Sequence, residues 1–524
     1  MHVALSAPCG EGTDEKDNMK KEGKVYIVGA GPGDPDLITL KGVGYMRRAD
    51  VVVYDYLIGK EILQYAAENA RLIYVGKIGG HQNIAQEDLN RILVEEASKG
   101  NTVIRLKGGD PFIFGRGGEE AEYLEKAGIP FEVVPGITSA ISVPAYAGIP
   151  LTHRKCTSAV AFVTGHEDPD KAESRIDWES ISAIGTIVFL MGVRNLSKIT
   201  SSLIENGRAA DTPAALIRWG TTPDQETLTG SLGDIAALAE KKEFSPPAVF
   251  VVGDVVNLRE RLGWFEKKPL FGKGIVITRP EEQSEEFATL LRAEGARVIY
   301  FPTIRIIPPE DYGDLDRAID NIEKYQWIIF TSANGVRFFF ERFNMLRNDI
   351  RDLRGVKICT IGPATRDRVE AYSIRVDLIP ESYVSDSVVE AFRKMNIAGE
   401  NILLPRAEIA GDIIPAGLSA LGAHVDVATA YRTVSSGADG KAMKALMDSG
   451  EVDVIAFTSP STVVNFLNII GKETIIPDSI KIACIGPVTE NACRKAGLGV
   501  DIMQGPYSIP GLIDAIKANI KQDK

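Results

Sequence analysis

Residues 25–42 read VYIVGAGPGDPDLITLKG, and residues 105–120 read RLKGGDPFIFGRGGEE. In both stretches an apolar run, typical of a buried strand, leads into a loop that is rich in glycine. A loop with few Cβ atoms lets the backbone approach a ligand closely, and binding residues are concentrated on such loops. The two stretches therefore predict an α/β domain with a small-molecule site at the ends of its strands.

A dinucleotide-binding Rossmann motif is the alternative interpretation of the first stretch. Asp55 ends the next strand, VVVYD, at about the distance of a ribose-binding acid. The third glycine of G-x-G-x-x-G is missing, however, because Asp34 stands in its place. Pro32 stands where the fingerprint begins a helix, and proline has no N–H to offer a pyrophosphate. A Walker loop is excluded as well, since no G-K-[ST] follows.

Residues 133–154, VVPGITSAISVPAYAGIPLTHR, add a third stretch to this pattern. Together the three stretches resemble the uroporphyrinogen III C-methyltransferases of the tetrapyrrole methylase family. The resemblance implies two α/β lobes that meet near residues 135–155, with the methyl donor S-adenosylmethionine in the cleft between them. It also implies that uroporphyrinogen III is methylated twice to precorrin-2, and that this half of the chain forms a homodimer.

The composition is that of an ordinary globular protein of 524 residues, with 44% hydrophobic and 25% charged residues. No apolar run approaches the roughly 20 residues of a membrane helix, so we expect a cytoplasmic protein. The net charge of −12 argues against a nucleic-acid partner, for which a clustered basic face is typical. The five cysteines and five histidines show no metal-ligand spacing, so we expect reduced thiols and no metal.

From residue 23 to residue 265 short strands alternate with amphipathic helices, as in α/β proteins. For example, residues 86–100, QEDLNRILVEEASKG, place their apolar side chains on one helical face and end at Gly100. Residues 1–22 have too short an apolar stretch and too many acids for a signal peptide, so we expect a disordered leader. The charged segment 266–273, which contains proline and glycine, is expected to be a linker.

The chain from residue 274 to residue 520 contains an internal repeat. FTSANGVRFFF at residue 330 returns as FTSPSTVVNFL at 457, and IGPATRDRVEAYSIRV at 361 returns as IGPVTENACRKAGLGV at 485. The spacings of 127 and 124 residues nearly agree, and they exceed the roughly 20–50 residues of a solenoid repeat. The repeat therefore predicts a duplicated α/β unit.

This repeated half resembles the uroporphyrinogen III synthases over its whole length, with weaker motifs than the first half. The resemblance implies that hydroxymethylbilane is cyclised here, so that the two halves catalyse consecutive steps. It also implies that one lobe is inserted into the other. Lobe one would hold residues 274–304 and 434–520, and lobe two would hold residues 306–430, with a hinge near Arg305 and Tyr431.

For the methyltransferase half, the resemblance assigns Asp55 as the general base and Lys77 as the proton donor. A helix cap for Asp55 and a carboxylate-binding cation for Lys77 are the alternative roles. For Asp55 to act as a base and Lys77 as an acid at neutral pH, burial or charged neighbours would have to shift the pKa of each group. The residues that the resemblance places on the methyl donor are Pro32, Gly108, Gly109, Asp110, Ile113, Thr138, Ser139, Met191 and Gly220.

The acceptor implied by the resemblance carries eight carboxylates, which arginine can bind in bidentate contacts. Cations that stand beside the family motifs are expected to bind it, with surface ion pairs as the alternative role. They are Arg105, Lys107, Arg116, Arg154 and Arg218. The chain lacks a further module with a dinucleotide fingerprint, so we expect no oxidation or metallation of precorrin-2, unlike in the longer siroheme synthases.

For the synthase half, ring closure requires loss of a hydroxyl group and control of a cation-like intermediate by shape and hydrogen bonding. Tyr431, in ATAYRTV, matches the tyrosine that is usually proposed in this family to assist the leaving hydroxyl. Neutral donors in the cleft are expected from Thr331, Ser332, Ser459, Thr489 and the IGP turns at Gly362 and Gly486. Serine and threonine at strand ends also commonly cap helices, which is their alternative role here.

Two other interpretations of function stay open. The C-terminal half can be a tetrapyrrole-binding module that has lost catalysis, because its motifs are weak. The N-terminal half can act on a later corrinoid, because the first glycine-rich loop is shared across its superfamily. The sequence also leaves open whether the product feeds siroheme or cobalamin.

Overall fold

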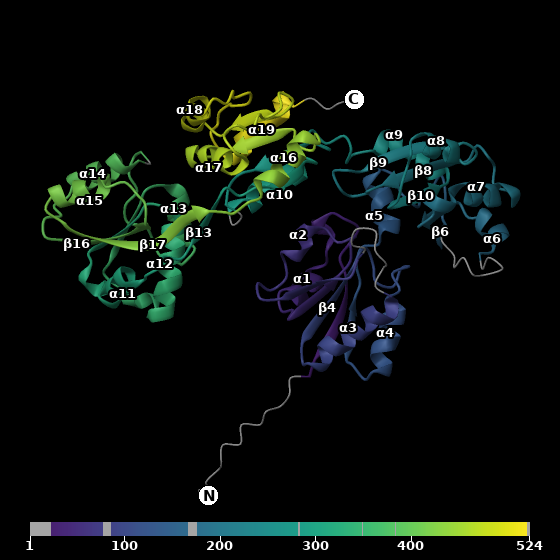
Figure 1. Ribbon diagram of the computed structural model, residues 1–524, viewed down its shortest axis with the longest axis horizontal. Coiled ribbons are helices and arrows are strands. Elements are labelled where there is room, and N and C mark those ends of the chain that lie inside the picture. The colour runs from purple at the N-terminus through teal and green to yellow at the C-terminus, as the bar shows by residue number, and fades with distance from the viewer. Residues whose placement is uncertain are drawn as a thin grey trace, which may run out of the picture. The chain divides into compact units, whose positions relative to one another are not determined.

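The computed structural model describes residues 22–76, 85–165, 176–280, 283–347, 349–382 and 384–520. Its contacts divide the chain into two compact units, Met1–Gly272 and Lys273–Lys524. In Figure 1 the first unit runs from purple to teal and the second from teal to yellow. Residues 1–21 of the expected leader lie outside the described residues.

The first sheet of unit 1 is parallel throughout and has the strand order β3-β2-β4-β1-β5. Its strands are β1 (Lys24–Gly29), β2 (Val51–Tyr54), β3 (Arg71–Tyr74), β4 (Thr102–Lys107) and β5 (Phe131–Val134). Apolar side chains of α1 (Leu40–Met46) and α2 (Lys60–Leu63) cover one face. Those of α3 (Gln86–Ser98) and α4 (Gly117–Lys126) cover the other. Because the strands are parallel, all their carboxyl ends lie at one edge.

The second sheet of unit 1 is mixed, with the order β6-β7-β10-β8-β9. Only β6 and β7 pair in parallel, and the other neighbours are antiparallel. The strands are β6 (Val160–Thr164), β7 (Thr186–Leu190), β8 (Pro213–Arg218), β9 (Glu226–Ser231) and β10 (Ala248–Val252). The helices are α5 (Ser139–Tyr146), α6 (Trp178–Ser182), α7 (Leu196–Glu205), α8 (Ile235–Lys241) and α9 (Arg259–Leu262). Helix α5 packs on one face, and α7 and α8 pack on the other.

The first sheet of unit 2 is parallel, with the order β12-β11-β18-β19. Its strands are β11 (Gly274–Ile277), β12 (Arg297–Tyr300), β18 (Val454–Phe457) and β19 (Lys481–Cys484). Its helices are α10 (Glu285–Ala293), α16 (Gly440–Asp448), α17 (Pro460–Ile470), α18 (Pro487–Lys495) and α19 (Ile509–Asn519). The sheet is therefore built from two segments of chain that are far apart in sequence.

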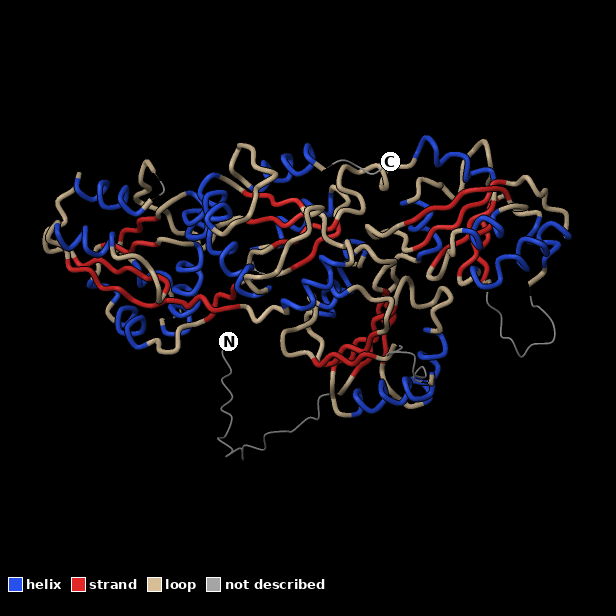
Figure 2. The backbone as a smooth tube through the Cα atoms, turned by 45° about the horizontal axis from the view of Figure 1, so that its top comes forward, coloured by secondary structure: helices blue, strands red, loops and turns tan. Residues whose placement is uncertain are grey.

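The second sheet of unit 2 is formed by the stretch of sequence between those two segments. Its strand order is β13-β17-β16-β14-β15. Its strands are β13 (Ile304–Ile307), β14 (Trp327–Phe330), β15 (Lys357–Thr360), β16 (Asn401–Ala407) and β17 (His424–Ser435). Its helices are α11 (Gly313–Asp320), α12 (Ala333–Leu346), α13 (Pro363–Glu370), α14 (Ser385–Arg393) and α15 (Ile413–Ala420). The chain enters along β13 and leaves along β17, which pair antiparallel, with Arg305 opposite Val434. Figure 2 shows the strands of each sheet side by side, with helices packed along them.

The structure confirms the internal duplication in unit 2. Ser332 after β14 and Ser459 after β18 both cap the next helix, with φ and ψ of −159° and 153° in the first case and −159° and 158° in the second. In each copy the next strand then ends at an IGP turn that begins a helix, α13 or α18. A short parallel bridge follows both times, from Cys359 to Leu378 and from Ala483 to Ile502.

No helix in the described ranges has both the length and the apolar character that crossing a membrane requires.

Candidate active sites

The two glycine-rich loops of unit 1 are hydrogen bonded to each other. The N–H of Gly109 donates to the carbonyl of Gly31 at 2.6 Å, and the N–H of Gly31 donates to the carbonyl of Gly109 at 3.3 Å. Gly29 packs on Gly136, where a Cβ atom on Gly29 would lie 2.5 Å from the Cα atom of Gly136. The loops after β1, β4 and β5 therefore meet at one edge of the sheet, and side chains there would push them apart.

Asp110 joins two of these loops through backbone contacts. Its Oδ1 atom accepts hydrogen bonds from the N–H groups of Phe112 at 2.8 Å and Ile113 at 3.2 Å. Its Oδ2 atom accepts from the N–H of Gly136 at 3.0 Å. The carboxylate thus fixes the loop that carries the expected donor contacts Gly108 to Ile113.

Thr138 and Ser139 lie beside the same loop, at the start of α5. Thr138 is the N-cap of this helix and accepts a hydrogen bond from the N–H of Ala140 at 3.3 Å. A Cβ atom on Gly109 would lie 3.7 Å from both the Cα atom of Thr138 and the nitrogen of Ser139. Gly109 also has φ of +67°, which favours glycine.

The Pro32 loop contacts the loop of the second sheet that carries Gly220. The N–H of Asp34 donates to Thr221 Oγ1 at 3.1 Å, and Tyr146 Oη donates to Asp34 Oδ2 at 2.7 Å. Burial, followed by the hydrogen bond to Asp34, raises the pKa of Tyr146. Asp34, which replaces the third glycine of the Rossmann fingerprint, therefore bridges the two lobes.

Backbone conformations that are uncommon for residues other than glycine occur in the same region. Trp219 and Thr221, on either side of Gly220, have φ of 47° and 71°, and Met191, after β7, has φ of 58°. Such residues cluster at functional sites. Met191 is 51% exposed. The structure thus brings Pro32, the 108–113 loop, Thr138, Ser139 and Gly220 together through direct contacts between their loops, whereas Met191 stands at the end of β7.

Asp55 directly follows β2, at the same edge of the first sheet. Its Oδ1 atom accepts a hydrogen bond from the N–H of Leu57 at 3.2 Å, so it closes a turn and does not cap a helix. Its Oδ2 atom lies 3.4 Å from Arg105 Nη2, and its side chain is 26% exposed. A Cβ atom on Gly108 would lie 3.1 Å from the Cβ atom of Leu57, so this turn contacts the second glycine-rich loop. Lys77 lies outside the described residues.

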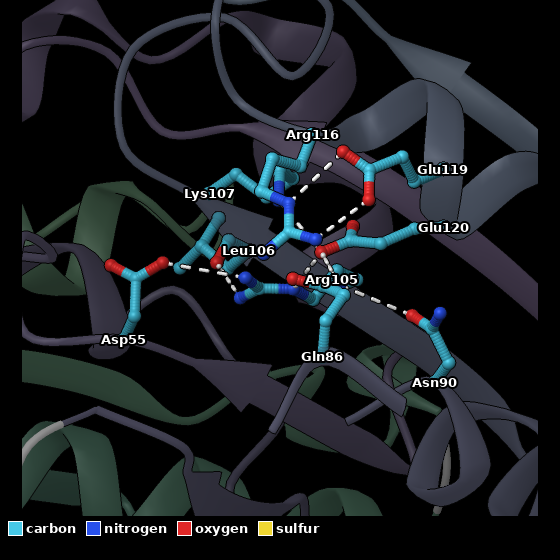
Figure 3. A network of polar contacts seen from close by, with 9 residues as sticks. All are labelled: Asp55, Gln86, Asn90, Arg105, Leu106, Lys107, Arg116, Glu119 and Glu120. Carbon is cyan, nitrogen blue, oxygen red and sulfur yellow. Dashed lines mark hydrogen bonds and ion pairs between the residues drawn. The ribbon is translucent and has the colours of Figure 1, made fainter. Parts of the chain in front are cut away.

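Two of the expected acceptor-binding cations are buried and paired inside the protein (Figure 3). Arg105 and Lys107 are 5% and 6% exposed, and both contact Glu120, which is 0% exposed. Burial, followed by repulsion from Arg105, lowers the pKa of Lys107. These side chains are engaged with the protein and do not face solvent as carboxylate receptors would.

The other three expected cations lie nearer the surface. Arg116 pairs with Glu119 at 2.7 Å, and both side chains are more than half exposed. Arg154 is exposed. Arg218 pairs with Glu226 at 2.6 Å.

In unit 2, Ser332 and Tyr431 share a hydrogen bond of 3.0 Å between their hydroxyl groups. Tyr431 lies in β17, is 8% exposed and stacks on Phe338 with ring centroids 5.8 Å apart. Ser332 also accepts a hydrogen bond from the N–H of Gly335 at 3.0 Å. A tyrosine hydroxyl therefore lies at the carboxyl end of β14, beside the N-terminus of α12.

The remaining neutral donors expected in unit 2 follow strand ends as well. Thr331 precedes Ser332, and Ser459 caps α17 by accepting from the N–H of Thr462 at 3.4 Å. Gly362 and Gly486 are the N-caps of α13 and α18. Thr489 is only 3% exposed, inside α18, so its hydroxyl is buried.

Sequence reasoning missed two groups of polar residues. Glu120 pairs the two buried cations of β4, and Gln86 donates to both Glu120 and Asn90. The signal in the sequence was two charges at alternate positions of an apolar strand. Arg279, two residues after β11, donates to Gln283 at 3.2 Å. Gln283 in turn donates to Asn334, in α12, at 3.4 Å. Burial lowers the pKa of Arg279.

In the part of the chain that the structure describes, no three His, Cys, Asp or Glu side chains are grouped as metal ligands.

Comparison with known families gives one match for each unit. The family model of tetrapyrrole (corrin/porphyrin) methylases matches residues 24–236, and that of uroporphyrinogen-III synthase HemD matches residues 285–514. The porphyrin biosynthesis protein HemD of Ruminiclostridium josui is 39% identical over 497 residues, which cover 95% of this chain and 98% of that protein. The S-adenosyl-L-methionine-dependent uroporphyrinogen III methyltransferase of Methanosarcina barkeri is 55% identical over 242 residues, 46% of this chain and 95% of that protein.

Solved structures are similar to each unit as well. The uroporphyrin-III C-methyl transferase of Thermus thermophilus, complexed with S-adenyl homocysteine, is 38% identical over 45% of this chain and 100% of that chain, with a TM-score of 0.40. A mutant uroporphyrinogen III synthase of Thermus thermophilus is 17% identical over 47% of this chain and 98% of that chain, with a TM-score of 0.36.

Proposed function

Because the chain belongs both to the tetrapyrrole methylases and to the uroporphyrinogen-III synthases, we propose that it catalyses two consecutive steps of tetrapyrrole biosynthesis. Unit 2 cyclises hydroxymethylbilane to uroporphyrinogen III, and unit 1 methylates this product twice to precorrin-2. The single observation that carries the proposal is the presence of both families in one chain, since the product of one reaction is the substrate of the other.

S-adenosylmethionine is the proposed methyl donor, and it supplies an already activated methyl group. The name of the Methanosarcina barkeri relative supports this choice. The residues present also fit such a ligand, because Gly109 has φ of +67° and little side-chain bulk lines the meeting point of the three loops. The residues that would hold the donor are Pro32, Gly108, Gly109, Asp110, Ile113, Thr138, Ser139, Met191 and Gly220.

Asp55 is the proposed general base of methyl transfer, and Lys77 the proposed proton donor. The position of Asp55 supports its role, because its turn contacts the second glycine-rich loop and its carboxylate is partly exposed. A base must lie within hydrogen-bond reach of the proton that it removes, and the partial exposure of Asp55 beside the second glycine-rich loop leaves its carboxylate accessible to a substrate bound there.

Tyr431 is the proposed acid that assists loss of the hydroxyl group from hydroxymethylbilane. Its hydroxyl proton would move to the leaving oxygen, which departs as water. The hydrogen bond to Ser332 supports this role, because Ser332 can accept from or donate to the tyrosine hydroxyl and so hold it in place.

Product analysis from hydroxymethylbilane tests both steps in the full chain. Without S-adenosylmethionine we expect uroporphyrinogen III, and with it we expect a dimethylated product. Formation of only the type I isomer, at the spontaneous rate, would contradict the synthase step and favour a C-terminal module that binds tetrapyrroles without catalysis. Supplying uroporphyrinogen III directly then tests the methyltransferase by itself.

A further inference from the structure

We propose that Glu120 is a positioning residue for methyl transfer, which acts on Asp55 through Arg105. This inference rests on the proposed function, in which Asp55 is the general base. Glu120 lies in α4, and its side chain is 0% exposed. Figure 3 shows its carboxylate directed toward Arg105 and Lys107, with Asp55 on the far side of Arg105.

One oxygen of Glu120 gathers three donors. Its Oε1 atom accepts from Lys107 Nζ at 2.8 Å, Arg105 Nε at 3.2 Å and Gln86 Nε2 at 3.3 Å. The two cations are 5% and 6% exposed. Removing charges from water is costly unless they are paired and hydrogen bonded. Glu120 therefore permits two cations to lie inside the lobe, next to the proposed site.

Arg105 is fixed on three sides. Its Nε atom donates to Glu120, its Nη1 atom donates to the carbonyl of Leu106 at 2.9 Å, and its Nη2 atom lies 3.4 Å from Asp55 Oδ2. The guanidinium is planar, so contacts at Nε and Nη1 determine where Nη2 points. Glu120 thus sets the position of the group that contacts Asp55.

The strand register explains why these side chains meet. In the parallel pair β2–β4, Val53 lies opposite Arg105. Asp55 follows Val53 by two residues, so it projects on the same face of the sheet as Arg105 and Lys107. Helices α3 and α4 cover this face, and α4 brings Glu120 to it.

Loss of the Glu120 charge changes the surroundings of Asp55 in a defined way. In Glu120→Gln the amide cannot neutralise Arg105, which remains charged. Arg105 already pairs with Asp55 Oδ2 at 3.4 Å, and without the Glu120 charge the guanidinium moves closer to this carboxylate. The tighter ion pair would hold the Oδ2 atom away from the proton that it must remove, and a displacement of about 1 Å can slow a reaction about 10²-fold.

The test compares Glu120→Gln with Glu122→Gln in the full chain. Glu122 lies on the exposed side of the same helix, so it is a matched control. For Glu120→Gln we expect kcat of methyl transfer to fall by at least about 10-fold, while the Kd of S-adenosylhomocysteine, measured by calorimetry, stays within twofold. Glu122→Gln should match the wild type in both. A purely structural role for Glu120 would lower the Tm without this separation of kcat from ligand affinity.

A double-mutant cycle with Asp55→Asn tests the pathway through Asp55. If Glu120 acts through Asp55, Glu120→Gln should lower kcat by less than about threefold in the Asp55→Asn background. If Glu120→Gln fails to fold, Arg105→Lys takes its place in the cycle, because lysine keeps the charge but lacks the planar fork.

Wild-type kcat in folded Glu120→Gln would overturn the proposal and leave the proposed function intact. Equal losses in both Asp55 backgrounds would overturn it as well, since Glu120 would then act independently of Asp55. Full activity of Asp55→Asn would instead overturn the general-base role of Asp55, and the positioning role of Glu120 with it.

Discussion

Asp55 is held by one contact on each carboxylate oxygen, from Leu57 N–H on Oδ1 and from Arg105 on Oδ2. Replacing it with asparagine keeps the size of the side chain and one acceptor oxygen but removes the basic group. We expect Asp55→Asn to slow methyl transfer by about 10²-fold or more, with the affinity for the methyl donor nearly unchanged. Single-turnover kinetics and calorimetry measure the two quantities.

Asp36 provides the matched control for this substitution, because it is an exposed aspartate of the same lobe. Asp36→Asn should behave as the wild type. If Asp55→Asn turns over at the wild-type rate, the carboxylate only closes its turn, and another group removes the proton.

The Tyr431 hydroxyl shares a hydrogen bond with Ser332, whereas its ring stacks on Phe338. Tyr431→Phe should therefore preserve the fold and reduce formation of uroporphyrinogen III by at least about 10-fold. Spontaneous closure then yields a larger share of the type I isomer, which chromatography of the oxidised products measures. Tyr372→Phe, in the same lobe, is the control, and an unchanged isomer ratio in Tyr431→Phe would exclude Tyr431 from the mechanism.

At the residue scale, the sequence indicated which glycine-rich loops meet in unit 1 but not which way the charged side chains beside them turn. Arg105 and Lys107 stood beside the family motifs, and we expected both to bind acceptor carboxylates. Their partner Glu120 lies 15 and 13 residues further along the chain, in a helix. Its pairing depends on how α4 packs on β4, and no local pattern encodes that packing.

At the scale of elements, the positions of the loops proposed to bind the methyl donor in unit 1 depend on contacts between its two lobes. The hydrogen bond from Tyr146 to Asp34 is one of these contacts. Tyr146→Phe removes this donor and leaves the ring in place. A hydrogen bond to a carboxylate contributes about 1.5–3 kcal/mol, so we expect donor affinity to fall about 10-fold as the Pro32 and Gly220 loops separate. Calorimetry with S-adenosylhomocysteine measures this, with the exposed Tyr123→Phe as control. Equal affinities in the two variants would show that the bridge does not shape the donor site.

Strand β5 and helix α1 are joined by a surface cluster around Glu132. This carboxylate accepts from Lys41, Tyr45 and Lys24, and these contacts lower its pKa to about 2. The unfolded pKa is about 4.3. The folded pKa is lower, so the stabilisation is present above about pH 4.3 and is lost as the pH falls toward 2.

Glu132→Gln should accordingly lower the Tm of unit 1 by about 2–4 °C at pH 7. The difference from the wild type should shrink below about pH 4, because the Glu132 carboxylate of the unfolded chain takes up a proton there while the native carboxylate stays ionised until the pH nears 2. Scanning calorimetry at pH 7, 5 and 3 measures it. A difference that stays constant across this range would assign the effect to packing and not to charge.

At the element scale, the helices with a periodic apolar pattern could be predicted from the sequence. The pairing of the strands could be predicted less well. The helix expected within residues 86–100 is α3, Gln86–Ser98, with Leu89, Leu93 and Ala97 buried. The sequence did not predict that the second sheet of unit 1 is mixed. A short apolar run predicts a strand but does not determine whether it pairs with its neighbouring strands in parallel or antiparallel.

For the whole molecule, the repeat was the most informative sequence feature of unit 2. It predicted that β14–α12 and β18–α17 share one local structure, because the same FTS segment must end a strand and cap a helix. The expectation that residues 306–430 form a lobe inserted into the other came from the family resemblance and not from the repeat, because an inserted lobe leaves no local signal where the chain returns.

The two units should work as separate enzymes. Each of the four sheets takes its strands from one unit, and each described hydrophobic core lies within one unit. All residues proposed for methyl transfer lie before Gly272, and those proposed for ring closure lie after it. Residues 1–272 should therefore methylate supplied uroporphyrinogen III, and residues 273–524 should produce it from hydroxymethylbilane, each with kcat within about threefold of the full chain.

Circular dichroism and thermal unfolding establish first that each separate unit is folded, since each is long enough to bury its own core. Mixing the two folded units should then leave both rates unchanged, because neither active site borrows a group from the other unit. The full chain would differ only in delivering uroporphyrinogen III from one unit to the other. If one folded unit is inactive until the other is added, a residue of the second unit completes its site, and the division of the chain into two self-sufficient enzymes is wrong.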